Sequence, residues 1–134
     1  MLLPDHLAQP ALDAAAGLGA GTAHLRIACH ENRAVALRDG EVENVASDSA
    51  TGLSVRVIVD GAWGFAATHD LTQRGAVDAA HRAVAMARLS ASADPVELAP
   101  EPSHGTSTWI MPVEIDPMTV PDADVIRSEE HTSE

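Results

Sequence analysis

The chain has 134 residues, a formal net charge of −12 and one cysteine, Cys29. Its length suits one hydrophobic core and is too short for two domains of usual size. The acidity disfavours direct binding to nucleic acid. A lone cysteine excludes an internal disulfide. No stretch is apolar over the roughly 20 residues that a helix needs to cross a bilayer. Because the first residues also lack the pattern of a secretory signal, we expect a cytoplasmic protein that does not bind a membrane.

Residues 4–18 carry apolar side chains at helical spacing and predict a short N-terminal helix. Pro10 would either kink this helix or mark its first turn. The glycines at 17, 19 and 21 precede a strand, whereas a dinucleotide-binding loop follows one, so we interpret them as a helix terminator. From Ala23 the apolar period changes to two, which predicts a strand with Leu25, Ile27 and Cys29 on one side.

Two Asp-Gly dipeptides predict tight hairpin turns, because a two-residue primed turn needs positive φ at both positions. Asp39-Gly40 separates residues 34–38 from 41–47, and Asp60-Gly61 separates 53–59 from 62–68. In the first hairpin, one face is expected to be wet. Counting outward from the second turn gives the pairing of the two strands, and this pairing gives the hairpin two different faces. One face pairs Val55, Val57 and Val59 with Ala66, Gly64 and Ala62; the other pairs Arg56 and Ile58 with Phe65 and Trp63.

The small residues opposite the valines leave room for a closely packed helix, and residues 71–90 supply one with an alanine-rich stripe. The predicted fold is therefore α+β: an antiparallel sheet of hairpins with a long helix on one face and a short N-terminal helix. The face with Ile58, Trp63 and Phe65 has no obvious cover. Either the first helix or the C-terminal residues cover it, or it is an interface to another domain or a partner subunit.

Prolines become frequent from Pro95 onward, which predicts an extended connector with one short strand at 106–111. Residues 127–134 can be encoded by AGATCGGAAGAGCACACGTCTGAA, the beginning of a widely used sequencing adapter. We therefore expect a domain over 1–94, a connector over 95–126 toward a further domain, and a non-native tail over 127–134.

No group of residues in the sequence completes an active site. His30-Glu31 begins like the zinc-protease pattern His-Glu-x-x-His, but position 34 is Ala and the pair is expected in a turn between strands. We interpret Cys29 as a small core thiol rather than a nucleophile, and Glu41 with Glu43 as a solvated edge rather than a catalytic pair. The remaining histidines lack metal-ligand spacing and are expected to face solvent: His6, His24, His69, His81 and His104.

Residues 37–45 (LRDGEVENV) and 52–71 (GLSVRVIVDGAWGFAATHDL) closely resemble the N-terminal domain of the TldD/PmbA metallopeptidase family, once described as modulators of DNA gyrase. The similarity spans about residues 5–126, and the segment 109–117 is similar to the TldD branch. The resemblance implies one subunit of a zinc protease that pairs with a TldE/PmbA-like partner and cleaves unfolded or modified peptides. The family's zinc motif, His-Glu-x-x-x-His, lies in a C-terminal half that this chain does not include. We therefore expect no catalytic, cofactor or metal residue here and an inactive fragment.

What the resemblance transfers to this chain is structural. It implies two turns and a packed corner beside an interface that meets a TldE/PmbA-like subunit or a second copy of the chain. The expected structural and interface residues are Asp39, Gly40, Arg56, Ile58, Asp60, Gly61, Trp63, Gly64 and Phe65. One alternative is a stand-alone protein-interaction module that binds through Trp63 and Phe65. A third hypothesis, a gyrase-linked nucleic-acid factor, is disfavoured by the acidity.

Overall fold

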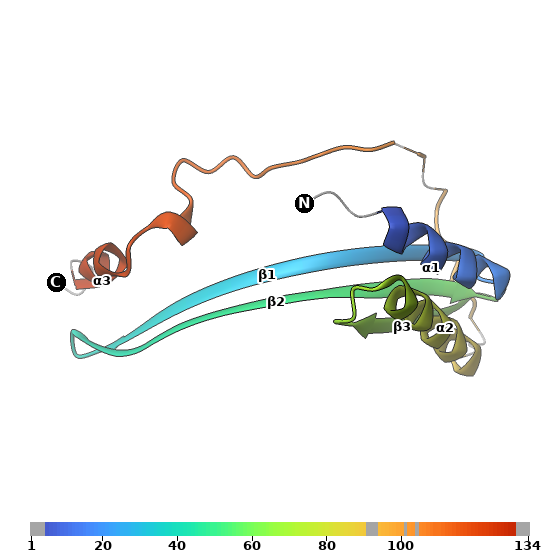
Figure 1. Ribbon diagram of the computed structural model, residues 1–134, viewed down its shortest axis with the longest axis horizontal. Helices are drawn as coiled ribbons and strands as arrows, with labels where there is room; N and C mark the ends of the chain where they lie inside the picture. The colour runs from blue at the N-terminus through green and yellow to red at the C-terminus, as the bar shows by residue number, and fades with distance from the viewer. Residues whose placement is uncertain (1–4, 91–93, 101, 104, 131–134) are drawn as a thin grey trace. The chain divides into compact units, whose positions relative to one another are not determined.

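The computed structural model describes residues 5–90, 94–100, 102–103 and 105–130. The elements in chain order are α1 (Asp5–Gly17), β1 (Thr22–Arg38), β2 (Glu41–Val59), β3 (Ala62–Thr68), α2 (Gln73–Leu89), a 3-10 helix η1 (Pro117–Thr119) and α3 (Asp122–Glu130) (Figure 1). The strands form one sheet in the order β1-β2-β3. The predicted α+β class, with helices packed on an antiparallel sheet, is confirmed.

The chain divides into two compact units. The core unit comprises Met1–Cys29 and Ala50–Pro100, and the tip unit comprises His30–Ser49 and Glu101–Glu134. The core unit holds α1, β3 and α2, with the residues of β1 up to Cys29 and those of β2 from Ala50. The tip unit holds the remaining residues of β1 and β2 together with η1 and α3. Each unit is described below by itself.

The N-terminal helix ends as the glycines predict. Gly19 adopts a φ of +91°, and the amides of Gly19 and Ala20 bond back to the carbonyls of Ala16 (2.9 Å) and Ala15 (3.0 Å). These two bonds form the Schellman arrangement, which satisfies the last carbonyls of the helix and needs a glycine at its left-handed residue. Pro10 lies inside α1, so the alternative in which it marks the first turn is wrong.

Both Asp-Gly pairs form tight turns with positive φ at the two central residues. The φ values are 53° and 79° for Asp39-Gly40, and 49° and 77° for Asp60-Gly61. The register of β2 with β3 agrees with the count from the second turn: Val57 pairs with Gly64, and Ile58 with Trp63. The valine face and the aromatic face of this hairpin are therefore as predicted.

The core lies on the valine face, under α2. Val55 and Val57 are fully buried there against the alanine stripe of the helix. A Cβ at Gly64 would clash with the backbone carbonyl of Ala83 and lie 2.8 Å from the amide of Ala87, so the helix touches the strand at a position where only glycine fits. The buried residues of α2 are Gly75, Ala76, Ala79, Ala80, Ala83, Val84 and Ala87.

The start of α2 is fixed by Thr72, whose side-chain oxygen accepts a hydrogen bond of 3.1 Å from the Gly75 amide. This N-cap satisfies one of the amides that the first helical turn leaves without a partner. The N-terminal helix contributes Leu7, Ala11 and Ala15 to the same core. Both helices of the core unit therefore cover the valine face.

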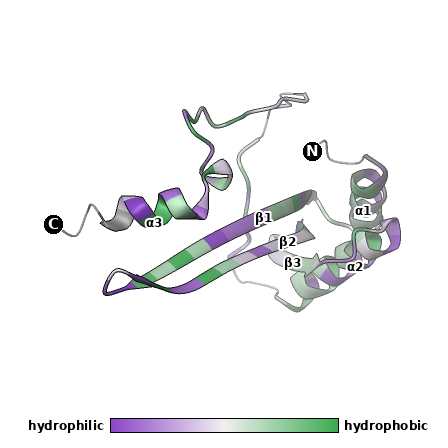
Figure 2. Ribbon diagram, turned by 60° about the vertical axis from the view of Figure 1, so that its left-hand side comes forward, coloured by the Kyte–Doolittle hydropathy of each residue, from purple (hydrophilic) through white to green (hydrophobic). Residues whose placement is uncertain are grey.

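Three expectations about element boundaries are wrong. His30 and Glu31 do not lie in a turn, because β1 continues through them to Arg38; β2 likewise runs unbroken through residues 48–52. Polar residues remain in these strands because a paired strand satisfies its backbone without burying side chains. Figure 2 shows the hydrophilic and hydrophobic bands along β1 and β2. Residues 106–111 form no strand, and α3 was not predicted.

Candidate functional site: the aromatic face of the sheet

Four side chains of the core unit share the sheet face opposite the two helices. Arg56 and Ile58 come from β2, and Trp63 and Phe65 from the edge strand β3, paired as Arg56 with Phe65 and Ile58 with Trp63. Trp63 is 37% exposed and Phe65 52% exposed, whereas Ile58 is buried at 8%. We call this set the aromatic face.

Arg56 fixes the position of the indole. Its guanidinium carbon lies 5.0 Å from the centre of the Trp63 ring, and its Nη2 lies 3.1 Å from Nδ1 of His24. A cation over the face of an indole is attracted by the ring quadrupole and restricts the motion of both side chains. The hairpin register predicted that Arg56 and Trp63 share one face of the sheet. Only the structure shows that the guanidinium lies over the indole ring.

A shallow cavity of about 360 Å³ opens beside the indole. It is lined by Arg56, Trp63, Gly64, Phe65 and Met86. Met86 lies half exposed on α2 and was missed by the sequence analysis. Gly64 was the feature of the sequence that could have indicated Met86. It packs against the helical turn from Ala83 to Ala87, so a side chain on that turn must lie next to the strand.

The aromatic face offers apolar area and one guanidinium, that of Arg56, which are features suited to binding a partner. The expectation that the first helix covers this face is wrong, because α1 packs with α2 on the other side of the sheet. Trp, Phe, Met and Arg are the residue types enriched at protein interfaces.

The thiol of Cys29 is exposed and accepts a hydrogen bond of 3.3 Å from the Thr51 hydroxyl, so its interpretation as a core thiol is wrong. Leu25 and Ile27 pack against the core, whereas Cys29, two residues further along the same strand, does not. His24 is half-buried rather than solvent-facing. The exposed histidines are His6, His30, His69 and His81; His104 lies outside the described residues.

Among the described residues, no group of three or more His, Cys, Asp or Glu side chains is placed to hold a metal ion. Glu43 instead bonds Arg38 across the first hairpin at 3.1 Å. These residues do not fit the zinc ion of a metallopeptidase. No helix among the described residues is both long and apolar enough to cross a bilayer.

Among the described residues, the carboxyl group of Asp70 has a shifted pKa. Hydrogen bonds from the side chain and the backbone of Thr72 lower the pKa of Asp70 below its ordinary value, since both favour the ionised form. The Thr72 amide donates to Asp70 Oδ1 at 3.1 Å. Asp70 thereby orients the residue that caps α2, which is a structural role.

Residues 30–87 match the family model described as PmbA/TldA metallopeptidase domain 1. They run from the middle of β1 through both hairpin turns to the helix that packs on Gly64. A metalloprotease of Methanocaldococcus jannaschii, MJ0996, is 29% identical over 68 residues, which are 51% of this chain. Over this stretch the chain is similar to the first domain of the PmbA/TldD metallopeptidase family.

The same fold is present in the crystal structure of TldE from Thermococcus kodakarensis, with a TM-score of 0.53 and 19% identity over 75% of this chain. At this level of identity the match shows a likeness of fold alone. The chain spans 15% of the length of the Methanocaldococcus metalloprotease and 23% of that of TldE.

Proposed function

We propose that this chain is the N-terminal part of a TldD-like zinc metallopeptidase subunit that cleaves unfolded or modified peptides. The observation that carries the proposal is the match of residues 30–87 to the family's first domain. In a zinc peptidase the metal activates water for attack on the peptide carbonyl. The residues described here do not fit that metal, so the proposal places the zinc site in a C-terminal half and treats this chain alone as inactive.

The proposed role of this chain is to hold other parts of the enzyme through the aromatic face. Trp63, Phe65 and Met86 offer apolar area around a shallow cavity, and Arg56 keeps the indole in place. An ordered aromatic anchor with an adjacent cavity is typical of the centre of a protein interface. Its occupant would be the catalytic half or a TldE/PmbA-like partner subunit.

Three finer statements belong to the same proposal. Residues 109–117 (WIMPVEIDP) favour the TldD branch. The subunit would work in the cytoplasm. Residues 1–94 would form the first domain, 95–126 the connector, and 127–134 a tail that does not come from the natural gene. Residues 131–134 of this tail lie outside the described residues.

The genomic sequence downstream of codon 126 is the decisive first test. We expect the reading frame to diverge from the present sequence at codon 127 and to continue into a His-Glu-x-x-x-His motif. A natural stop codon near Ile126 would contradict the peptidase proposal. It would favour a stand-alone interaction module, for which the exposure of Trp63 and Phe65 is the specific support.

The aromatic face is tested in the full-length subunit recovered from that gene, co-expressed with a tagged TldE-like subunit. Replacing both Trp63 and Phe65 by Ser should lower the amount of complex and the hydrolysis of an unfolded protein substrate by about tenfold or more, since interface anchors carry most of the binding energy. The matched control replaces Val42 and Val45, two exposed apolar residues of the first hairpin, by Ser. Equal loss of the complex in both variants would exclude a specific role for the aromatic face.

The 134-residue chain and the full-length subunit distinguish the remaining hypotheses. The 134-residue chain should show no peptide hydrolysis with zinc added, whereas the full-length subunit should be active with its partner. Hydrolysis by the 134-residue chain alone would overturn the assignment of the zinc site to another half. A shift of DNA mobility by the chain at low salt would instead support the nucleic-acid hypothesis.

A further inference from the structure

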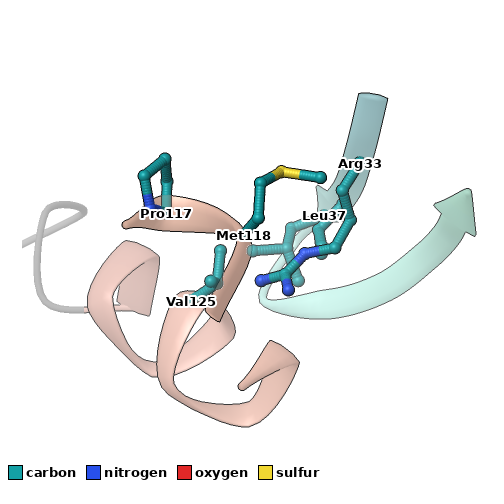
Figure 3. Close-up of a pocket in the computed structure, with 6 residues that line it drawn as sticks. Arg33, Leu37, Pro117, Met118 and Val125 are labelled. Atoms are coloured by element: carbon teal, nitrogen blue, oxygen red, sulfur yellow. The ribbon is translucent and has the colours of Figure 1, made fainter. Parts of the chain in front are cut away.

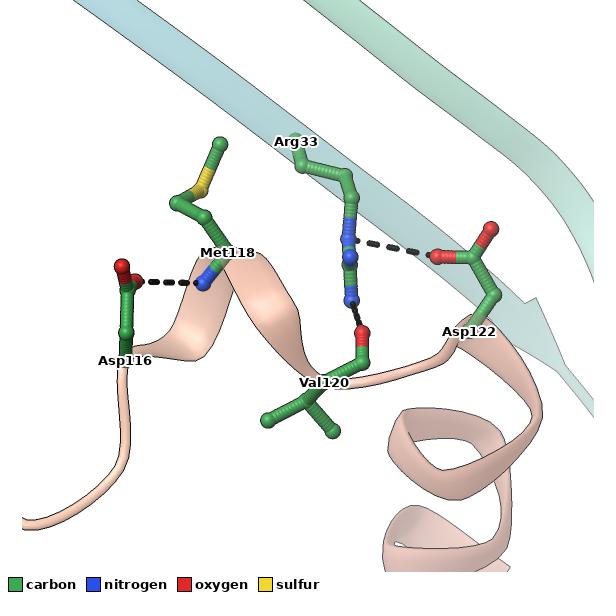
Figure 4. Close-up of polar contacts among 5 residues, drawn as sticks. All are labelled: Arg33, Asp116, Met118, Val120 and Asp122. Atoms are coloured by element: carbon green, nitrogen blue, oxygen red, sulfur yellow. Dashed lines mark hydrogen bonds and ion pairs between the residues drawn. The ribbon is translucent and has the colours of Figure 1, made fainter.

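Within the tip unit, Arg33 of β1 contacts a segment 87 residues further along the chain. Its Nε lies 3.2 Å from Oδ1 of Asp122, and its Nη2 donates a hydrogen bond of 2.6 Å to the carbonyl of Val120 (Figure 4). The Arg33 side chain is only 20% exposed. One guanidinium therefore bonds two groups at the beginning of α3, a carboxylate and a backbone carbonyl.

The segment that Arg33 contacts has a locally fixed shape. Oδ1 of Asp116 accepts a hydrogen bond of 2.9 Å from the Met118 amide, and the Asp116 carbonyl accepts one of 2.8 Å from the Thr119 hydroxyl. Pro117, whose φ is already restricted, occupies the first turn of η1. The result is a short, ordered lead into α3 that places Met118 and the Val120 carbonyl toward β1 (Figure 4).

An apolar contact accompanies the polar one. Arg33, Val35 and Leu37 are half-buried and alternate with exposed residues along β1. With Pro117, Met118 and Val125 they surround a cavity of about 370 Å³ (Figure 3). The segment covers this stripe of β1 without filling the space between them, so the contact is loosely packed.

We propose that residues 116–126 form a latch that closes over the Val35–Leu37 stripe of the first hairpin and is locked by Arg33. The latch is built to open. Its ion pair is partly solvated, with the Asp122 side chain 48% exposed, and such pairs are weak. The apolar contact around the cavity is also loosely packed, so it adds little to hold the segment closed.

The latch differs from the neighbouring ion pair on the same hairpin. Arg38 bonds Glu43 at 3.1 Å across the turn, and its side chain is 73% exposed. That contact joins residues already held by the hairpin, whereas Arg33 joins the hairpin to residues that have no other bond to it among those described. The proposal depends only on residues 33–37 and 116–126, and it stands whether or not a catalytic half follows.

Amide hydrogen exchange of the 134-residue chain, followed by mass spectrometry, tests the latch. Arg33→Met keeps the apolar stem and removes both polar contacts. We expect residues 117–126 to exchange about tenfold faster in this variant, and less so in Asp122→Asn, which leaves the bond to Val120 intact. Arg38→Met, the matched control with the same loss of charge, should leave exchange in 117–126 unchanged.

A charge-swapped chain, Arg33→Asp with Asp122→Arg, should recover part of the protection that Arg33→Asp alone removes. Equal exchange of 117–126 in the wild type and in Arg33→Met would overturn the latch, and so would equal acceleration by Arg38→Met. Protection of α2 reports on folding in every variant. If Arg33→Met also loses protection of α2, the comparison of Asp122→Asn with the wild type tests the latch instead, because this surface variant leaves β1 unchanged. Equal exchange of 117–126 in these two proteins would then overturn the latch.

Discussion

The two halves of β2 have opposite environments although they belong to one strand. From Leu53 to Val59 the strand is buried at every second residue or more, whereas residues 41–51 are exposed throughout. The buried half faces the alanine stripe of α2, and residues 41–49 of the exposed half belong to the tip unit. The strand persists in both because its backbone pairs with β1, so pairing sets the length of the strand and helix cover sets its burial.

The two Asp-Gly turns repeat this contrast. Both have positive φ at Asp and Gly, but a Cβ at Gly40 would meet nothing, whereas one at Gly61 would lie 2.7 Å from the Cα of Pro95. The carbonyl of Gly61 also accepts a hydrogen bond of 2.8 Å from the Val96 amide. The first turn therefore needs its glycine for conformation alone, and the second also for close packing.

The largest expected effect in this comparison comes from Gly64. Gly64→Ala should lower the free energy of unfolding by at least about 4 kcal/mol, because the new methyl group would collide with helix backbone that cannot rotate away. Urea unfolding followed by circular dichroism measures the loss. A loss below about 1 kcal/mol would mean that α2 does not pack on β3 at this position.

Two truncations compare the halves of β2 directly. Leu53→Ala removes a fully buried side chain and should lower the free energy of unfolding by about 3 kcal/mol. Val42→Ala, in the half-exposed environment of the tip unit, should change it by less than about 0.5 kcal/mol. The same unfolding measurement applies, and similar losses at both positions would contradict the division into a covered and an uncovered half.

The turns provide a smaller, matched comparison. Gly40→Ala should destabilise by about 1 kcal/mol, the cost of a left-handed non-glycine residue. Gly61→Ala should cost at least about 2 kcal/mol, since Pro95 must also move away from the new methyl group. Equal unfolding midpoints for the two variants would show that the contact with Pro95 contributes nothing.

The smallest expected effect is a pH dependence at Asp70. Its pKa in the folded chain lies below the ordinary value of 3.8, so the unfolded chain binds its proton more readily. The resulting stabilisation is present above pH 4 or so and is lost as the pH falls through the folded pKa. Asp70→Asn keeps an acceptor for the Thr72 amide and should flatten the decline of the urea midpoint between about pH 5 and about pH 2. A decline as steep as in the wild type would refute this assignment.

Local chemistry made much of the fold predictable. The preference of Asp-Gly for positive φ predicted both turns. The position of the second turn then set the pairing of β2 with β3, which puts Val57 and Ile58 on opposite faces of the sheet. The same register placed Trp63 and Phe65 on one face and indicated that Gly64 meets a helix. Met86 and the cation over the indole could not be predicted, because they depend on where α2 crosses the strand.

The sequence by itself determined the two turns, the faces of the second hairpin and the end of α1, because these depend on φ preferences and on the side-chain period of neighbouring residues. It left undecided how far β1 and β2 extend, which sheet face α1 covers and what Arg33 contacts. Only the tertiary structure decided these, because each depends on residues far apart in the chain: His30 and Glu31 stay in a strand through their pairing, and Arg33 meets Asp122 through the fold of the tip unit.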